Sequence, residues 1–248
     1  MIGPLLRLEP DEASEIRLPV ASLSALSTAD FPGRRAAVIH LQGCPLQCGY
    51  CEVSEMAIAR RGEPGEWEAM RGFLEIRPDG LDAVVFSGGE PTLHVDLPQA
   101  LAQVHEMGLA VGLHTAGPYP ERLERLLPWL DWVALDVKGR GRDFDRICGR
   151  SGIWQRHARS LSLLLEGEVP FECRTTVHWK DFALEDLERL AMTLADCGVR
   201  RYALQVARSE RCRDPDYCLP VAGAPPREAL EALIRRLAPH FSRLELRH

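Results

Sequence analysis

The sequence has no long hydrophobic run, few aromatic residues and no strong excess of charge of either sign. No apolar stretch approaches the ~20 residues that a helix needs to cross a bilayer, and the N-terminus has no basic segment followed by an apolar core. We therefore expect no membrane partner and a cytoplasmic location. Aromatic residues make up only 6% of the chain and the net charge is −6, so we expect no nucleic-acid partner either.

A second pair of metal-ligating cysteines is also lacking. Of the eight cysteines, three fall together in HLQGCPLQCGYCEV, as Cys44, Cys48 and Cys51. A chain of this length without a secretory leader favours reduced thiols over a disulfide framework. Structural zinc usually takes four ligands from two paired clusters, so zinc stays an alternative that requires a downstream cysteine to fold back. Three thiolates suit a cubane iron–sulfur cluster in which one iron has no protein ligand.

Short apolar runs alternate with helical segments along most of the chain. Six runs have strand character, at residues 35–43, 81–89, 109–117, 131–139, 170–178 and 201–208. Segments of helical period lie at 94–108, 120–130, 183–198 and 223–241, and a short strand, RLELR, follows the last of them. Six strand–helix units in a row predict an α/β fold with a parallel sheet. A complete barrel has eight units, so an open doubly wound sheet and a partial barrel both fit.

Polar and glycine residues gather at the carboxyl ends of these strands, which form the ligand-binding edge of a parallel α/β fold. The second strand ends in SGGEPT, the third in HTAG and the fourth in DVKG. Alternation along a strand places Asp136 and Lys138 on one face, and it does the same for Arg174, Thr176 and His178. We expect these faces to point into the mouth of the fold, and the alternative is that the groups only pair with one another as internal ion pairs.

The cysteine motif and the glycine turn together resemble a known superfamily. A C-x3-C-x2-C loop after the first strand, with Tyr50 before its last cysteine and GGE (88–90) at the end of the next strand, is similar to radical S-adenosylmethionine enzymes. The segments STADFPGRRAAVIHLQGCPLQCGYC, VVFSGGEPTL, LPWLDWVALDVKG and ECRTTVHWKDFALEDLERLA extend the resemblance to the longer type of anaerobic ribonucleoside-triphosphate reductase activating protein, a glycyl-radical-enzyme activase. The resemblance implies the partial (βα)6 TIM-like barrel, with a lead-in at residues 1–27 and one domain at 28–248 that includes the C-terminal helix.

The resemblance also implies a role for each motif residue. The thiolates of Cys44, Cys48 and Cys51 would hold one 4Fe-4S cluster and form the catalytic centre, with S-adenosylmethionine chelating the open iron. The turn would receive the methionyl amino group through Gly88, Gly89 and Glu90. Further cofactor contacts are expected from Tyr50, Thr115, Asp136, Lys138, Arg174 and Thr176. The chain departs from the family pattern at His114 and Ala116, where the usual turn is Asp-Thr-Asn-Gly, and at Glu52 and Val53, where the usual pair is His-Asn.

The implied function is reductive cleavage of S-adenosylmethionine to a 5′-deoxyadenosyl radical, which forms a glycyl radical on a partner enzyme. The expected partner is an anaerobic (class III) ribonucleotide reductase, and the expected electron donor is a flavodoxin or ferredoxin. Six strand–helix units leave little chain to cap the mouth, which favours a substrate presented by another protein. The alternatives are a radical enzyme acting on a small molecule, such as a deazapurine precursor, and a non-catalytic zinc or redox module. The roles of Cys212 and Cys218 and the oligomeric state are left open.

Overall fold

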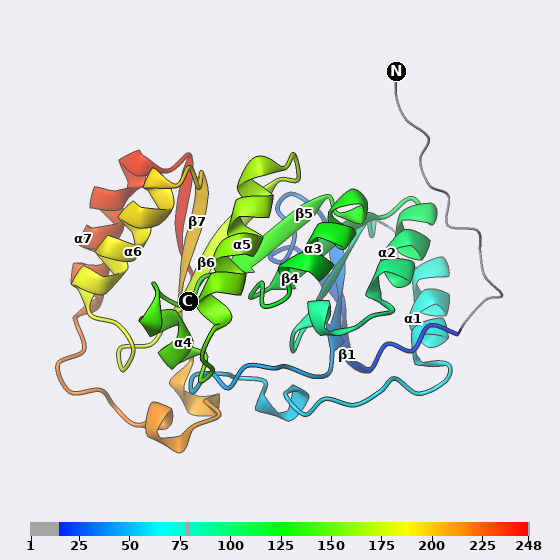
Figure 1. Cartoon of the computed structure of the whole chain (residues 1–248), viewed down its shortest axis with the longest axis horizontal. Helices are drawn as coiled ribbons and strands as arrows, with labels where there is room; N and C mark the ends of the chain where they lie inside the picture. Colours follow the sequence, from blue (N-terminus) through cyan, green and yellow to red (C-terminus); the bar gives the residue numbers. More distant parts are fainter. Residues whose placement is uncertain (1–14, 78–79, 248) are drawn as a thin grey trace.

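The central sheet has eight strands in the order β1 to β8, in a computed structural model that describes residues 15–77 and 80–247 (Figure 1). β1 (Val20–Ser27) is antiparallel to β2 (Ala36–Leu41) at one edge, and each later strand is parallel to the one before it. These strands are β3 (Ala83–Gly88), β4 (Ala110–Thr115), β5 (Trp132–Asp136), β6 (Phe171–Val177), β7 (Arg201–Val206) and β8 (Arg243–Arg247). The six predicted strands are confirmed as β2 to β7, and RLELR adds β8 beside β7. The predicted lead-in includes the edge strand β1, and residues 1–14 of it lie outside the described residues.

Helices follow the strands and cover one face of the sheet (Figure 1). Four predicted helical segments appear with shorter bounds, as α2 (Leu97–Glu106), α3 (Pro120–Leu126), α6 (Leu184–Asp196) and α7 (Arg227–Leu237). Gly108 and Gly198 follow α2 and α6 with φ of +72° and +97°, the left-handed conformation in which a glycine commonly ends a helix. The structure adds three helices that the sequence analysis did not name, α1 (Glu66–Glu75), α4 (Arg142–Ile147) and α5 (Ile153–Glu166).

The main core lies between the sheet and these helices. Alternate strand residues such as Ile39, Phe86 and Leu113 point into it and are fully buried. The opposite face of the sheet is concave in the manner of a partial barrel. A separate small hydrophobic cluster on this face includes Phe31, Val85 and Trp132. This alternation leaves the inward residues nearest the carboxyl ends of the strands free to line a cavity. Among the described helices, none is both long enough and apolar enough to cross a membrane.

Candidate active site

A cavity of about 220 Å³ opens at the carboxyl ends of the parallel strands. Every cofactor-site residue expected from the sequence lines it, with the exception of Arg174; the lining includes Cys44, Cys48, Tyr50, Cys51, Gly88, Gly89, Glu90, Thr115, Asp136, Lys138 and Thr176. These residues come from the ends of β2, β3, β4, β5 and β6. The fold therefore brings the predicted residues together at one place, and their individual roles remain predictions.

The loop with the three cysteines has no regular secondary structure of its own, and other segments satisfy its backbone groups. The amide of Cys44 donates to the Ala57 carbonyl at 3.0 Å, and the amide of Gln47 donates to the Cys148 carbonyl at 2.8 Å. Inside the loop the Cys51 amide donates to the Cys48 carbonyl at 3.2 Å. These bonds hold the loop against the cavity with all three thiols on its lining.

The three thiols line one cavity, as a cluster held by three cysteines requires. Within the described ranges, no three His, Cys, Asp or Glu side chains lie close enough together to hold one metal ion. Burial raises the pKa of the Cys44 thiol to about 12 and also raises that of Cys48. Both groups are therefore protonated until a metal displaces the proton.

The Gly88–Gly89–Glu90 turn packs directly on the segment that leads to Cys44. The Gly89 amide donates to the Leu41 carbonyl and the Glu90 amide donates to the Gly43 carbonyl, each at 2.8 Å. Gly88 has φ of +100°, and a Cβ at Gly89 would lie 2.2 Å from the Gly43 carbonyl oxygen. The two glycines are required here because any side chain would separate the turn from the cysteine loop.

The carboxylate of Glu90 is buried beside the cavity, at 1% exposure. It accepts hydrogen bonds from the Thr92 amide (3.1 Å) and hydroxyl (2.6 Å), the Thr115 hydroxyl (2.6 Å) and the Ala116 amide (2.9 Å). Burial raises the pKa of Glu90, and these hydrogen bonds oppose the rise. Among the described residues no lysine or arginine forms an ion pair with it. A cationic ligand group in the cavity would therefore complement this carboxylate.

Lys138 and Asp136 line the cavity from the end of β5. The Lys138 ammonium donates to the Tyr50 hydroxyl at 3.1 Å and lies 3.7 Å from a carboxylate oxygen of Asp136. Lys138 is 8% exposed, whereas the Asp136 side chain is 41% exposed. The internal ion pair considered from the sequence is thus present, and both of its members also line the cavity.

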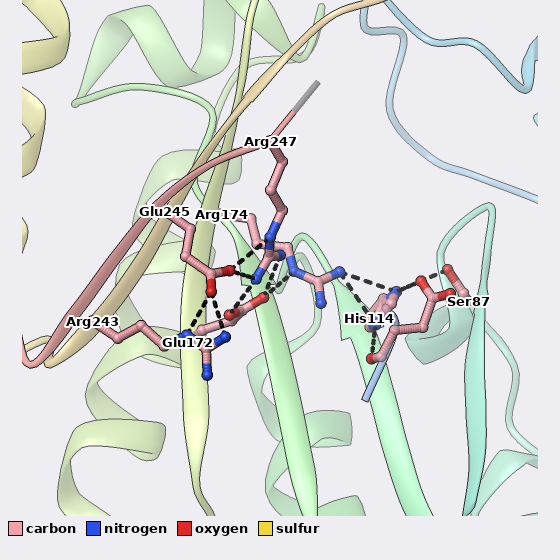
Figure 2. Close-up of polar contacts among 8 residues, drawn as sticks. Ser87, His114, Glu172, Arg174, Arg243, Glu245 and Arg247 are labelled. Carbon is pink, nitrogen blue, oxygen red and sulfur yellow. Dashed lines mark hydrogen bonds and ion pairs between the residues drawn. The ribbon is translucent and has the colours of Figure 1, made fainter. Parts of the chain in front are cut away.

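Arg174 lies away from the cysteine side of the cavity. Its Nε donates to a carboxylate oxygen of Glu172, and its Nη1 lies 3.3 and 3.2 Å from the two ring nitrogens of His114 (Figure 2). His114 itself lines the cavity, as do Ala116, Glu52 and Val53 at the other positions that depart from the family pattern. His178 is not among the lining residues, and its Nε2 lies 3.0 Å from the Tyr217 carbonyl.

The sequence analysis missed a segment after β7 that packs on the cysteine loop. The amides of Arg213 and Asp214 donate to the carbonyls of Cys51 (2.9 Å) and Gly49 (3.0 Å). The ring of Tyr217 lies so close to Gly49 that a Cβ there would be 2.4 Å from it. Cys212 and Cys218 belong to the same segment, which is therefore not remote from the cysteine loop. No local pattern signals this contact, because the two segments are far apart in the chain.

Comparison with known proteins agrees with this geometry. Residues 38–194 match the family model described as the radical SAM superfamily. A Methanocaldococcus jannaschii protein named as a candidate glycyl-radical enzyme activating enzyme is 34% identical over 206 residues, covering 80% of this chain and 83% of that protein. A 7-carboxy-7-deazaguanine synthase of Thermococcus kodakarensis is 24% identical, covering 72% of this chain and 66% of that protein. Streptococcus suis SuiB, crystallised with its precursor peptide SuiA, matches with a TM-score of 0.61 and 16% identity over 87% of this chain, which spans about half (49%) of the SuiB chain.

The chain therefore belongs to the radical SAM superfamily, and its α/β fold is the partial barrel of that family. It is a radical SAM enzyme, and its superfamily implies a 4Fe-4S cluster and S-adenosylmethionine. The name of the Methanocaldococcus jannaschii protein is that of the activase family that the motifs resemble.

Proposed function

We propose that this protein is a glycyl-radical-enzyme activase that acts on an anaerobic ribonucleotide reductase and takes electrons from a flavodoxin or ferredoxin. One observation carries the proposal. The cysteine loop and the Gly88–Glu90 turn are joined by backbone hydrogen bonds, and the three thiols and the buried carboxylate line one open cavity. The 34% identity to a protein named for glycyl-radical enzyme activation supports the choice of substrate.

In this proposal the chain's residues bind and orient two cofactors. Cys44, Cys48 and Cys51 would hold the 4Fe-4S cluster, which supplies the electron for cleavage of the sulfonium C–S bond when S-adenosylmethionine is bound. Glu90 would accept hydrogen bonds from the methionyl ammonium, and its buried negative charge would complement that cation. Lys138, whose ammonium is held by Tyr50 and Asp136, would bind the carboxylate of the cofactor.

The test is anaerobic reconstitution followed by electron paramagnetic resonance with a co-expressed ribonucleotide reductase. We expect a brown protein with about four irons per chain and a glycyl doublet on the reductase that requires both S-adenosylmethionine and a reductant. The Cys48→Ala variant serves as the control and should give no doublet. A colourless protein with stoichiometric zinc would instead favour the non-catalytic module.

A second function is favoured by a specific observation. Several relatives besides the Thermococcus kodakarensis protein are named as 7-carboxy-7-deazaguanine synthases, so a radical reaction on a deazapurine precursor is the competing proposal. It predicts fast 5′-deoxyadenosine release when the precursor is added without any partner protein. That result, together with no glycyl doublet, would replace the activase proposal.

A further inference from the structure

The concave face of β6, β7 and β8 carries a set of arginines beyond the cavity wall, on strands that follow Thr176 in the sheet order. In the register of these strands Thr176 pairs with Gln205, and Gln205 pairs with Arg247. Residues in register point to the same face of a sheet, and both Thr176 and Gln205 line the cavity. Arg247 therefore stands one strand beyond the cavity wall, on the same face.

Guanidinium groups outnumber carboxylates on this face. The Glu172 carboxylate accepts a hydrogen bond from Arg174 and two from Arg247, at 2.8 and 3.0 Å (Figure 2). The Glu245 carboxylate accepts hydrogen bonds from Arg247 and from Arg243. Three arginines thus share two carboxylates. We call these three, with Arg201, the arginine surface. Within the described residues Arg201 forms no ion pair, and its guanidinium lies 5.5 Å from the Trp132 ring centroid.

His114 lines the cavity and contacts Arg174 without neutralising its positive charge. Its Nε2 lies 2.9 Å from the Asp30 carbonyl, to which it must donate a proton, so its Nδ1 is an acceptor. That Nδ1 faces the Arg174 Nη1 and the Ser87 hydroxyl, both at 3.3 Å (Figure 2). Burial, reinforced by the charge of Arg174, holds the pKa of His114 well below its usual value. The ring is neutral and leaves the charge of Arg174 in place.

Other carboxylates nearby do not remove the excess of positive charge on this face. Asp136, the register neighbour of Arg174, forms its ion pair with Lys138. Asp30 lies 4.0 Å from the His114 ring, and its carboxylate accepts from the Ser27 hydroxyl at 2.5 Å. Counting Asp30, Glu172 and Glu245 against the four arginines still leaves a positive surface.

Alanines stand beside two of these polar side chains. In register, His114 pairs with Ala134 and Arg174 pairs with Ala203. Each alanine therefore separates two long polar side chains on the concave face. The planar fork of a guanidinium matches a carboxylate in geometry and charge.

We propose that the arginine surface is a second subsite of the cavity, which binds a carboxylate of the substrate while the cofactors occupy the side of the cysteines and Lys138. The inference rests on the proposed function. For the activase, the carboxylate belongs to an acidic side chain close to the target glycine in the partner. For the deazapurine reaction, it belongs to the small molecule itself. Arg174 contacts this carboxylate, and His114 positions Arg174.

The experiment uses the reconstituted enzyme with peptides that span the glycine loop of the reductase, in which each Asp or Glu is changed in turn to Asn or Gln. The wild-type enzyme must first give a glycyl doublet with the unchanged reductase. Its absence counts against the proposed function. In that case the subsite is tested with a carboxylated deazapurine precursor and its carboxamide.

We expect one acidic-to-amide change in the peptide to raise the KM of the wild-type enzyme about 10- to 100-fold, as expected for a charge-assisted hydrogen bond. In Arg174→Gln the KM should already be raised by that factor and should no longer respond to the same change. His114→Asp places a carboxylate beside Arg174, so its KM should also be raised and should not respond to the peptide change. Arg174→Lys keeps a positive charge, so its KM should regain part of the sensitivity to that change. Arg236→Gln, an exposed change on α7, is the control and should match the wild type.

Three results would overturn the inference. The first is equal sensitivity of the wild type and Arg174→Gln to every peptide change. The second is an Arg174→Gln enzyme whose KM rises only for S-adenosylmethionine, which would return Arg174 to the cofactor site. The third, in the small-molecule arm, is equal affinity for the precursor and its carboxamide. Unfolding curves of each variant separate these outcomes from loss of the fold. If Arg174→Gln proves unstable, His114→Asp is the second variant, because it keeps both arginine partners of Glu172 in the chain.

Discussion

Replacing Gly89 by alanine should detach the glycine turn from the cysteine loop. The new Cβ would lie 2.2 Å from the carbonyl oxygen and 2.7 Å from the carbonyl carbon of Gly43, the residue before Cys44. Both atoms belong to the backbone, so no side-chain rotation can relieve the contact. The backbone of one segment must move, and the hydrogen bonds from the amides of Gly89 and Glu90 lie at that point.

The expected cost follows from these contacts. Overpacking a well-packed site costs about 1–3 kcal/mol, and each backbone hydrogen bond that is lost adds about 0.5–1.5 kcal/mol. A total of about 3 kcal/mol corresponds to a fall in Tm of roughly 6–12 °C for a domain of this size. Because Gly43 carries the chain into Cys44, the same displacement should reduce the iron bound after reconstitution.

The assay compares thermal unfolding of the apo and reconstituted forms with the iron content of each variant. Gly72→Ala is the matched control, since Gly72 lies inside α1 and its added Cβ would meet nothing within 4 Å. It should stabilise the protein by about 0.5–1 kcal/mol and leave iron content unchanged. A Gly89→Ala protein with wild-type Tm and full iron would refute the close approach of the turn to the loop.

Four further predictions concern single side chains. Cys48→Ala should abolish both iron retention and 5′-deoxyadenosine formation, because two thiolates cannot hold a cubane in one geometry; iron analysis and product chromatography check this. Glu90→Gln should raise the Kd for S-adenosylmethionine about tenfold or more through loss of a charge-assisted hydrogen bond, measured by equilibrium binding, and an unchanged Kd would remove Glu90 from the cofactor site. Cys212→Ala and Cys218→Ala should each leave iron content and basal cleavage intact, and iron loss would reveal a second metal site. Burial would raise the pKa of Glu172, but the hydrogen bonds and charges of Arg247 and Arg174 outweigh it and lower that pKa. The ionised Glu172 therefore stabilises the fold above about pH 4.3, and this stabilisation is lost as the pH falls through the lowered pKa. In thermal unfolding at a series of acid pH values, Glu172→Gln should show a flatter dependence of stability on pH.

Local sequence patterns carried the fold and the cofactor motifs. Short apolar runs located β2 to β7, and helical periodicity located four helices, two of which end at a glycine, because period and end signals are local properties of the chain. The C-x3-C-x2-C spacing and the GGE turn identified the two segments that meet at the cavity. The register of parallel strands then decides which of their neighbours reach the same edge.

Contacts between distant segments could not be predicted in this way. Nothing around Glu90 shows that its carboxylate binds Thr115 and Ala116 on the next strand, since that depends on how two strand ends meet. Arg174 alternates with Thr176 as expected, yet it pairs with Glu172 two residues earlier on the same strand and so turns away from the cysteines. A pattern fixes the face on which a side chain lies, and the neighbours on that face decide its direction.

The cysteine loop shows why such contacts matter for function. A loop without secondary structure keeps one conformation only if other segments satisfy its backbone groups, and here they come from three places. Ala57 lies just after the loop, Cys148 follows α4, and Arg213 and Asp214 follow β7. The guanidiniums of Arg150 and Arg213 add bonds to the carbonyls of Pro45 (2.9 Å) and Leu46 (3.5 Å). The loop is therefore held by protein segments from three parts of the chain, so the fold itself would meet part of the ordering cost of cluster binding.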